Sequence, residues 1–209
     1  MKVYISADME GASGVTSFQQ VSAGNPEFQH YRNVWIDDIN TLAAGAFEAG
    51  AKTVLVNESH EGMNYLLPDR LDPRITYISG RLKALNQMEG LDSTFTTAFL
   101  FAHARAGSEG VLSHSYIPPD IFEMKLNGIP VGEMALNAAA AGVMGVPIGL
   151  VIGDDCTAAE AEGLIPGVKT VVTKHHISQF TASCRPLSEV RNELFQAARD
   201  AVKEAEQRI

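Results

Sequence analysis

The sequence has little cysteine, no long apolar run and no cluster of basic residues. Cys156 and Cys184 lie far apart, in neither a metal-binding nor a redox pattern, which argues against a disulfide framework and a Cys-x-x-Cys motif. No apolar run approaches the ~20 residues that span a bilayer, and Met1-Lys2 leads directly into a predicted strand instead of a signal peptide. We therefore expect a soluble protein that works in the reducing cytoplasm.

The shortage of basic residues narrows the class of partners. Lysine and arginine number 16 against 25 aspartate and glutamate residues, which gives a net charge of −9. Nucleic acids and anionic membrane surfaces are poor partners for a chain of this sign. A cation-binding site, or a substrate with a cationic end, suits the charge better.

The remaining composition is that of a folded chain with a sizeable core. Hydrophobic residues make up 45% of the sequence and charged residues only 20%, which excludes intrinsic disorder. A length of 209 residues fits one large domain or a domain with a smaller lobe. We treat residues 1–209 as a single α/β domain, with a truncated second lobe toward the C-terminus as the alternative.

Strand patterns alternate with helical patterns along the chain. Short apolar, β-branched runs predict strands, and apolar residues at steps of three and four predict helices. We predict strands at residues 3–5, 52–60, 74–80, 96–103, 147–155 and 168–174. We predict helices at residues 31–47, 82–88, 133–141, 158–164 and 188–209. A hairpin with an Asn127-Gly128 turn is predicted at 122–132. The order predicts an α/β fold, a mostly parallel central sheet flanked by helices with an inserted hairpin.

Two acids follow the first predicted strand. Asp8 and Glu10 are separated by one residue, so in an extended chain both carboxylates project from the same face. Like charges side by side repel unless a cation lies between them. This pair therefore indicates a cation site.

Further candidate ligands follow the other predicted strands and the hairpin. Ligands of open α/β sheets bind beyond the carboxyl ends of the strands, and the chain places these candidates there: Asp8, Glu10, His60, His103 and Glu133. Carboxylates together with imidazoles suit Zn²⁺, Mn²⁺, Co²⁺ or Fe²⁺ better than Ca²⁺ or Mg²⁺. Three carboxylates and two imidazoles exceed the usual needs of one zinc ion, so they predict a dinuclear hydrolytic site with a bridging water as nucleophile.

Each candidate also has a structural explanation. An aspartate such as Asp8 often caps a turn, and Glu133 is a suitable first-turn acid for a helix. His103 follows a very apolar strand, where a buried, hydrogen-bonded histidine is as common as a ligand. His60 and His114 also fit solvated loop histidines. Residue type alone leaves these alternatives open.

Two other features carry weaker signals. Asp154 and Asp155 also follow a predicted strand, but a cap of the next helix explains them better than a ligand role. Gly11 and Gly14 fall short of the G-x-G-x-x-G spacing of a dinucleotide-binding loop. Neither feature enters the predicted metal site.

Four separated blocks resemble one known family. The blocks YISADMEGASG, VLVNESHEGMN, FAHARAGSEGVLSHSY and NGIPVGEMALNAAAAG occur in this order and spacing. They resemble the zinc D-aminopeptidases, the DppA-like proteins of dipeptide operons. The similarity runs from Met1 to about Pro166 and continues more weakly to the final helix.

The resemblance implies a role for each candidate ligand. Asp8 corresponds to a carboxylate that bridges two zinc ions per subunit. Glu10 and His103 correspond to further ligands of one ion, and His60 and Glu133 to ligands of the other.

The resemblance also implies a catalytic residue, a substrate class and an assembly. His114, in Ser-His-Ser, matches the family's catalytic histidine, which is described as a nucleophile. We favour a general base or acid, or a partner for the developing oxyanion, because a metal-bound water is already a competent nucleophile. Family members form a decamer of stacked pentamers and release N-terminal D-amino acids, of the D-Ala type, from short peptides.

One departure from the family pattern leaves alternatives open. Family chains usually continue past the helix that ends here at Ile209 into a further α/β segment, which this sequence lacks. The departure puts the second lobe, its substrate contacts and the oligomer in question. The alternatives are a metal-dependent hydrolase of another small amide or ester, and a non-catalytic assembly protein with structural metals. The handedness of the substrate follows from the resemblance alone.

Overall fold

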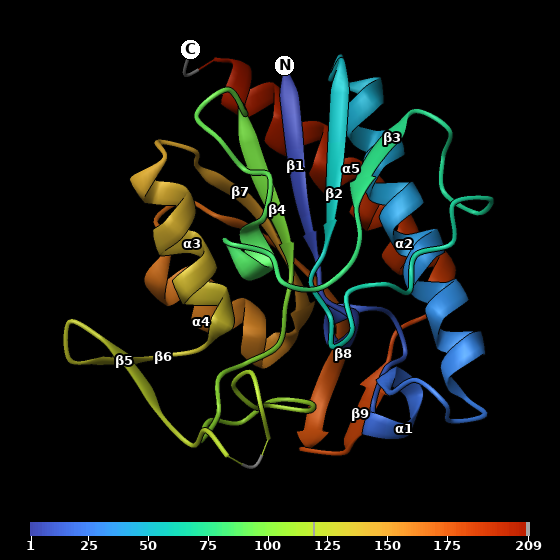
Figure 1. Cartoon of the computed structure of the whole chain (residues 1–209), viewed down its shortest axis with the longest axis vertical. Coiled ribbons are helices and arrows are strands. Elements are labelled where there is room, and N and C mark those ends of the chain that lie inside the picture. The colour runs from blue at the N-terminus through green and yellow to red at the C-terminus, as the bar shows by residue number, and fades with distance from the viewer. Residues whose placement is uncertain (119, 208–209) are drawn as a thin grey trace.

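A seven-stranded sheet in the order β3-β2-β1-β4-β7-β8-β9 forms the centre of the computed structural model, which describes residues 1–118 and 120–207 (Figure 1). Its strands are β1 (Lys2–Ala7), β2 (Thr53–Glu58), β3 (Ile75–Ile78), β4 (Thr97–Phe101), β7 (Ile148–Asp154), β8 (Lys169–Ser178) and β9 (Thr181–Cys184). Neighbouring strands are parallel except β8 and β9, which are antiparallel. The mostly parallel sheet of the sequence prediction is confirmed.

Helices cover both faces of this sheet. Figure 1 shows α2 and α5 on one face and α3 and α4 on the other. The helices are α1 (Phe18–Val21), α2 (Phe28–Glu48), α3 (Glu133–Val143), α4 (Asp155–Leu164) and α5 (Leu187–Glu206), with 3-10 turns η1 (Met9–Gly11) and η2 (Asn86–Met88). Val3 and Ile5 of β1 join the core under α2 and α5, whereas Tyr4 joins the core on the opposite face. This alternation is what a strand buried on both faces requires.

The inserted hairpin is also confirmed. Strands β5 (Met124–Leu126) and β6 (Ile129–Val131) pair antiparallel around Asn127 and Gly128. These two turn residues have φ angles of 53° and 83°. A two-residue turn with both φ angles positive is the Asn-Gly turn type whose twist matches the flanking strands.

Three local predictions need correction. The helix predicted at 82–88 is only the short turn η2, because Leu82 and Asn86 have positive φ angles of 63° and 50° that interrupt a right-handed helix. The strand predicted at 168–174 runs on to Ser178 and returns as β9, which the sequence reasoning did not predict. The last helix ends at Glu206, and the predicted end at Ile209 lies outside the described residues.

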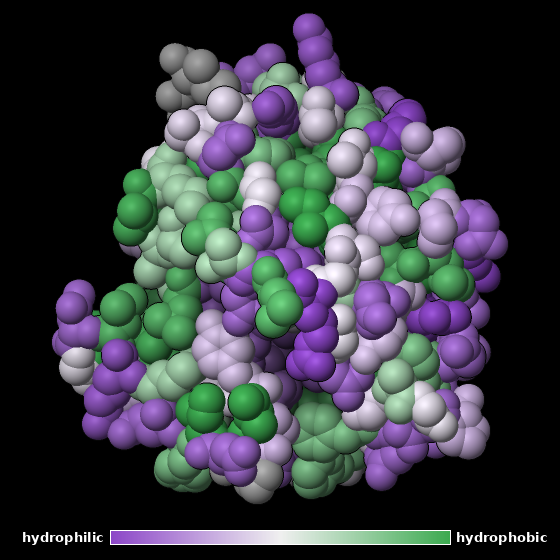
Figure 2. Space-filling view, in the orientation of Figure 1, coloured by the Kyte–Doolittle hydropathy of each residue, from purple (hydrophilic) through white to green (hydrophobic). Residues whose placement is uncertain are grey.

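The carboxyl ends of the central strands meet at one edge of the sheet. Ala7 of β1 pairs with Glu58 of β2, and Ser6 pairs with Leu100 of β4. Loops leaving these three strands therefore start side by side. In Figure 2, hydrophilic side chains gather around a hollow near the centre of the molecule, over these strand ends. Across the described ranges, no helix combines the length and apolar character needed to cross a membrane.

Candidate metal centre

The first two candidate ligands lie where β1 ends. Asp8 continues the extended chain and its side chain makes no capping hydrogen bond, whereas Glu10 lies inside η1. The two acids therefore do not share one extended segment, but their carboxylates do lie together. Gly11 makes this turn possible. A Cβ atom there would lie 2.7 Å from the backbone nitrogen of Ala102 and 2.7 Å from the carbonyl oxygen of Ile152. Only glycine therefore lets η1 pack against the ends of β4 and β7.

Buried polar side chains of β8 hold this turn through hydrogen bonds to its carbonyl oxygens. The Lys174 Nζ atom donates to the carbonyl oxygens of Glu10 at 2.6 Å and Ala12 at 2.9 Å, and the Thr173 hydroxyl donates to the Gly11 carbonyl at 3.0 Å. Lys174 is only 1% exposed, and burial lowers its pKa to about 8. The sequence reasoning placed Lys174 in a strand without a role.

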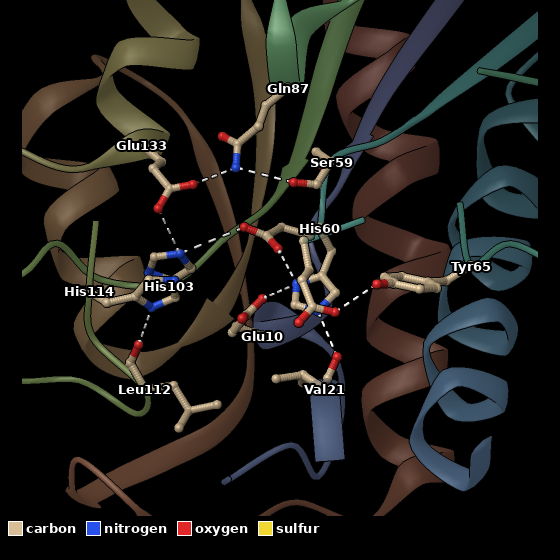
Figure 3. A network of polar contacts seen from close by, with 12 residues as sticks. Glu10, Val21, Ser59, His60, Tyr65, Gln87, His103, Leu112, His114 and Glu133 are labelled. Atoms are coloured by element: carbon tan, nitrogen blue, oxygen red, sulfur yellow. Dashed lines mark hydrogen bonds and ion pairs between the residues drawn. The ribbon is translucent and has the colours of Figure 1, made fainter. Parts of the chain in front are cut away.

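One cluster joins Asp8, Glu10 and His60, all of them buried (Figure 3). The His60 Nδ1 atom lies 3.2 Å from Asp8 Oδ1 and 2.9 Å from Glu10 Oε2. The other ring nitrogen, Nε2, lies 2.8 Å from the Val21 carbonyl oxygen. Because a carbonyl only accepts, Nε2 carries the proton, and in the neutral ring Nδ1 presents its lone pair to the carboxylates.

A second cluster joins His103 and Glu133. The His103 Nε2 atom lies 3.3 Å from Glu133 Oε1 and 3.6 Å from Asp8 Oδ2. Its Nδ1 atom lies 3.0 Å from the Ala104 carbonyl oxygen, so here too a backbone carbonyl fixes the proton on the far nitrogen. Asp8 thus directs one carboxylate oxygen at each histidine and lies between the two clusters.

Residues outside the clusters orient Glu133. This glutamate begins α3, where its Oε1 atom accepts from the Tyr116 backbone N–H at 2.5 Å. Its Oε2 atom accepts from the Gln87 side-chain amide, which in turn accepts from Asn137 Nδ2 at 2.6 Å. The sequence reasoning missed Gln87 and Tyr116.

His114 lies beside the second cluster. Its ring stacks on that of His103, with centroids 3.9 Å apart and planes at 8°. Its Nδ1–H donates to the Leu112 carbonyl at 2.6 Å, which leaves Nε2 unprotonated in the neutral ring. Burial, together with the positive charge of a protonated His103, lowers the pKa of His114 below its usual value. A neutral imidazole that can accept a proton therefore lies next to the candidate ligands.

A cavity of about 580 Å³ opens onto this arrangement. Its lining includes Asp8, Glu10, His60, His114 and Glu133. A volume of this size is typical of small-molecule sites. The candidate metal-binding side chains are thus buried, yet a small molecule can reach the site through the cavity.

Without a cation, the charges of the two clusters compensate one another only in part. Burial opposes ionisation of the carboxylates, and the neighbouring histidines outweigh it at Glu10 and Glu133, whose pKa values lie below their usual range, but not at Asp8. Burial and the charge of Glu10 raise the pKa of Asp8 well above its usual range. Burial opposes protonation of His103, but Glu133 and the neighbouring carboxylates outweigh it and raise the pKa of His103 to about 10. Among the described residues, Glu10 Oε2 and His103 Nε2 are buried and make no well-formed hydrogen bond, although each has a close charged neighbour, His60 Nδ1 at 2.9 Å and Glu133 Oε1 at 3.3 Å. Such atoms are costly unless something compensates them.

The residues present fit zinc. Two imidazoles with tautomers fixed by backbone carbonyls, and three carboxylates, are ligands that zinc accepts. The grouping differs from the one that the family resemblance implied, because Glu10 lies with His60 and His103 lies with Glu133.

Asp154 and Asp155 do not join the clusters. Asp154 caps α4, as predicted, because its Oδ1 atom accepts from the Thr157 backbone N–H at 2.7 Å. Asp155 lies in the first turn of that helix and accepts from the His176 backbone N–H at 2.7 Å, so its prediction as the cap is wrong.

Comparisons with known proteins agree on one family. A family model described as D-aminopeptidase (Peptidase_M55) matches residues 1–209. The D-aminopeptidase of Bacillus subtilis (strain 168) is 44% identical over 185 residues, which span 88% of this chain and 67% of that protein. The solved structure of the Zn-dependent D-aminopeptidase DppA from Bacillus subtilis, described as a self-compartmentalizing protease, matches with a TM-score of 0.96 and 39% identity. That match covers 99% of this chain and 75% of the other.

Proposed function

Because the chain belongs to the Peptidase_M55 family of D-aminopeptidases, we propose that it is a zinc-dependent aminopeptidase that releases N-terminal D-amino acids from short peptides. The solved relative of known zinc dependence has nearly the same fold over 99% of this chain. D-alanyl peptides are the substrates with which we would begin.

The observation that carries the proposal is the pair of buried clusters joined by Asp8. We assign Glu10 and His60 to one zinc ion, His103 and Glu133 to a second, and Asp8 to both. Glu10 Oε2 and His103 Nε2 support this assignment, because both are buried without a well-formed hydrogen bond and ligand bonds would satisfy both. When bound, such ions polarise the peptide carbonyl and lower the pKa of a water molecule.

His114 serves as the proton carrier in this proposal. Its Nδ1–H is committed to the Leu112 carbonyl, so proton transfer takes place at Nε2. Burial lowers the pKa of His114, which favours an unprotonated Nε2. Nε2 accepts the proton of the attacking water and returns it to the amine that leaves. This role needs no covalent bond between His114 and the substrate.

The open cavity favours catalysis over a purely structural metal site. Structural zinc sites are saturated by protein ligands and closed, whereas four of the five proposed ligands line a cavity of about 580 Å³. Apolar side chains of Phe18, Val21 and Ile117 form part of the same lining. They offer a surface for the small apolar side chain of an alanyl substrate.

Hydrolysis of matched dipeptides tests the proposed activity. We expect the zinc-loaded protein to cleave D-Ala-D-Ala much faster than L-Ala-L-Ala, and removal of metal by a chelator to abolish cleavage. The chelated protein resupplied with zinc is the control for unfolding. Equal rates on both dipeptides, or full activity after chelation, would contradict the proposal.

We also propose that the protein assembles as a homo-oligomer, with a decamer of stacked pentamers as the expected form, and works in the cytoplasm. The description of the solved relative as self-compartmentalizing supports an assembly. Free Cys156 and Cys184 are compatible with a reducing compartment. Light scattering on the purified protein tests the assembly, and a monomer at micromolar concentration would contradict it.

A further inference from the structure

The rim of the cavity carries a cation that the proposed chemistry does not use. Arg81 lines the same cavity as Asp8, Glu10 and His114, and its side chain is exposed. We propose that Arg81 binds the C-terminal carboxylate of a short peptide and makes a free carboxylate a determinant of specificity. This inference rests on the proposed aminopeptidase function.

Other charged groups at the rim already have partners. The Lys83 Nζ atom donates to Asn57 Oδ1 at 2.8 Å and to the Glu58 carbonyl, so it fastens its loop to the end of β2. The Glu61 carboxylate accepts from the Tyr65 hydroxyl at 2.7 Å. Within residues 1–118 and 120–207, the Arg81 guanidinium makes no hydrogen bond or ion pair. A ligand can therefore bind the Arg81 guanidinium without breaking an existing hydrogen bond or ion pair.

The backbone around Arg81 is fixed although the side chain is not. On one side, the Ser79 hydroxyl and the Gly80 backbone N–H both donate to the Met63 carbonyl. On the other side, Lys83 holds β2. Leu82 has a φ of 63°, a strained conformation for a leucine, and such conformations cluster at functional sites. The arginine thus extends from a held loop, so that binding has to order its side chain but not its backbone.

The geometry of an aminopeptidase substrate places a carboxylate toward the rim. The scissile bond must lie at the ligand clusters and His114, so the released part of the peptide extends away from them. Each residue adds at most ~3.6 Å of extended chain, and the cavity of about 580 Å³ has room for only a short peptide. In a chain of net charge −9, an anionic end needs a local cation, and a guanidinium pairs with both carboxylate oxygens at once.

Two variants and two substrates test this assignment. The dipeptide D-Ala-D-Ala carries the carboxylate, and its C-terminal amide differs only in lacking that charge. We compare the zinc-loaded wild type with Arg81→Gln and Arg81→Lys. Arg199→Gln serves as the control for lost charge, because Arg199 is a half-buried residue of α5 that pairs with its neighbour Asp200 and does not line the cavity.

We expect Arg81→Gln to raise KM for the free acid roughly tenfold with kcat nearly unchanged, because the contact is the same in the ground and transition states. The amide should be cleaved equally by wild type and variant. Arg81→Lys should restore part of the loss and Arg199→Gln should behave as wild type. Equal effects of Arg81→Gln on acid and amide, or no effect on either, would overturn the assignment.

Calorimetric binding of the same dipeptide separates this inference from the proposed function. If the wild type binds D-Ala-D-Ala more tightly than its amide and Arg81→Gln loses that difference, Arg81 holds the carboxylate whether or not cleavage occurs. Absence of cleavage together with this binding pattern would contradict only the proposed activity. Binding that ignores the carboxylate, or no binding to the wild type, would overturn the role of Arg81.

Discussion

The two ligand clusters differ in what surrounds them. The cluster of Asp8, Glu10 and His60 lies between the ends of β1 and β2 and is supported by backbone carbonyls and the buried Lys174. The cluster of His103 and Glu133 joins the end of β4 to the start of α3, and side chains from two other segments complete it.

The two clusters also differ in the titratable groups that lie beside them. Beside the first cluster, the titratable Lys174 is committed to the backbone carbonyls of Glu10 and Ala12. His114 lies beside the second cluster, where its ring stacks on His103 and its Nε2 atom is uncommitted. In the proposed mechanism, the first cluster therefore only binds metal, and protons move beside the second.

Asp8→Ala should have the largest effect because Asp8 lies between both clusters. We expect loss of both zinc ions and a fall in turnover beyond the roughly 10⁴-fold that a single acid–base residue contributes. Elemental analysis beside a rate measurement checks this, with Asp155→Ala as the control for a lost acid outside the site. Retention of both ions with near-normal turnover would show that Asp8 is no bridge.

His114→Ala should lower turnover without affecting metal binding. We expect turnover to fall by roughly 10² to 10⁴-fold while both ions stay bound, because the ligands remain. Metal content and kcat are the two readouts. Loss of zinc would make His114 a ligand, and a trapped acyl-imidazole on a slow substrate would make it a nucleophile.

Gln87→Leu should weaken the second cluster and spare the first. Without the amide, Glu133 Oε2 loses its donor, and such outer contacts typically carry about 10 to 100-fold in metal affinity or activity. Zinc titration should show one site weakened and one unchanged. Gln29→Leu, on the exposed side of α2, is the matched control, and equal weakening of both sites would argue against separate clusters.

Lys174→Met should change how the free energy of unfolding depends on pH, because Lys174 supports the first cluster. The pKa of Lys174 is about 8 in the fold, below its ordinary value of 10.5, so the unfolded chain binds more protons between these values. The free energy of unfolding of the wild type should therefore rise with pH from 8 to 10.5, by up to ~1.4 kcal/mol per pH unit from this group. Urea unfolding of the zinc-loaded proteins should show a shallower rise for Lys174→Met. Parallel slopes would contradict the burial of a charged Lys174.

The strand ends were predictable because they depend on local pattern. Asp8, His60 and His103 each follow an apolar run, and parallel topology alone brings such positions to one edge. The return strand β9 was not predictable in the same way, since the polar residues His175 and His176 continue β8 without a period-two apolar pattern.

The supports of the site were not predictable because they depend on contacts distant in sequence. Gln87 and Glu133 are 46 residues apart, and Lys174 and Glu10 are 164 apart. No spacing rule links residues at such separations. The grouping of the ligands has the same origin, because the contact between Glu133 and His103 joins the start of α3 to the loop after β4.

Zinc titration of the metal-free protein, followed by cleavage of D-Ala-D-Ala, tests the central claim most directly. Three carboxylates and two histidine nitrogens in two clusters predict that activity rises until about two zinc ions are bound per chain and then stays constant. A plateau at one ion per chain, or activity that does not depend on zinc, would contradict the account.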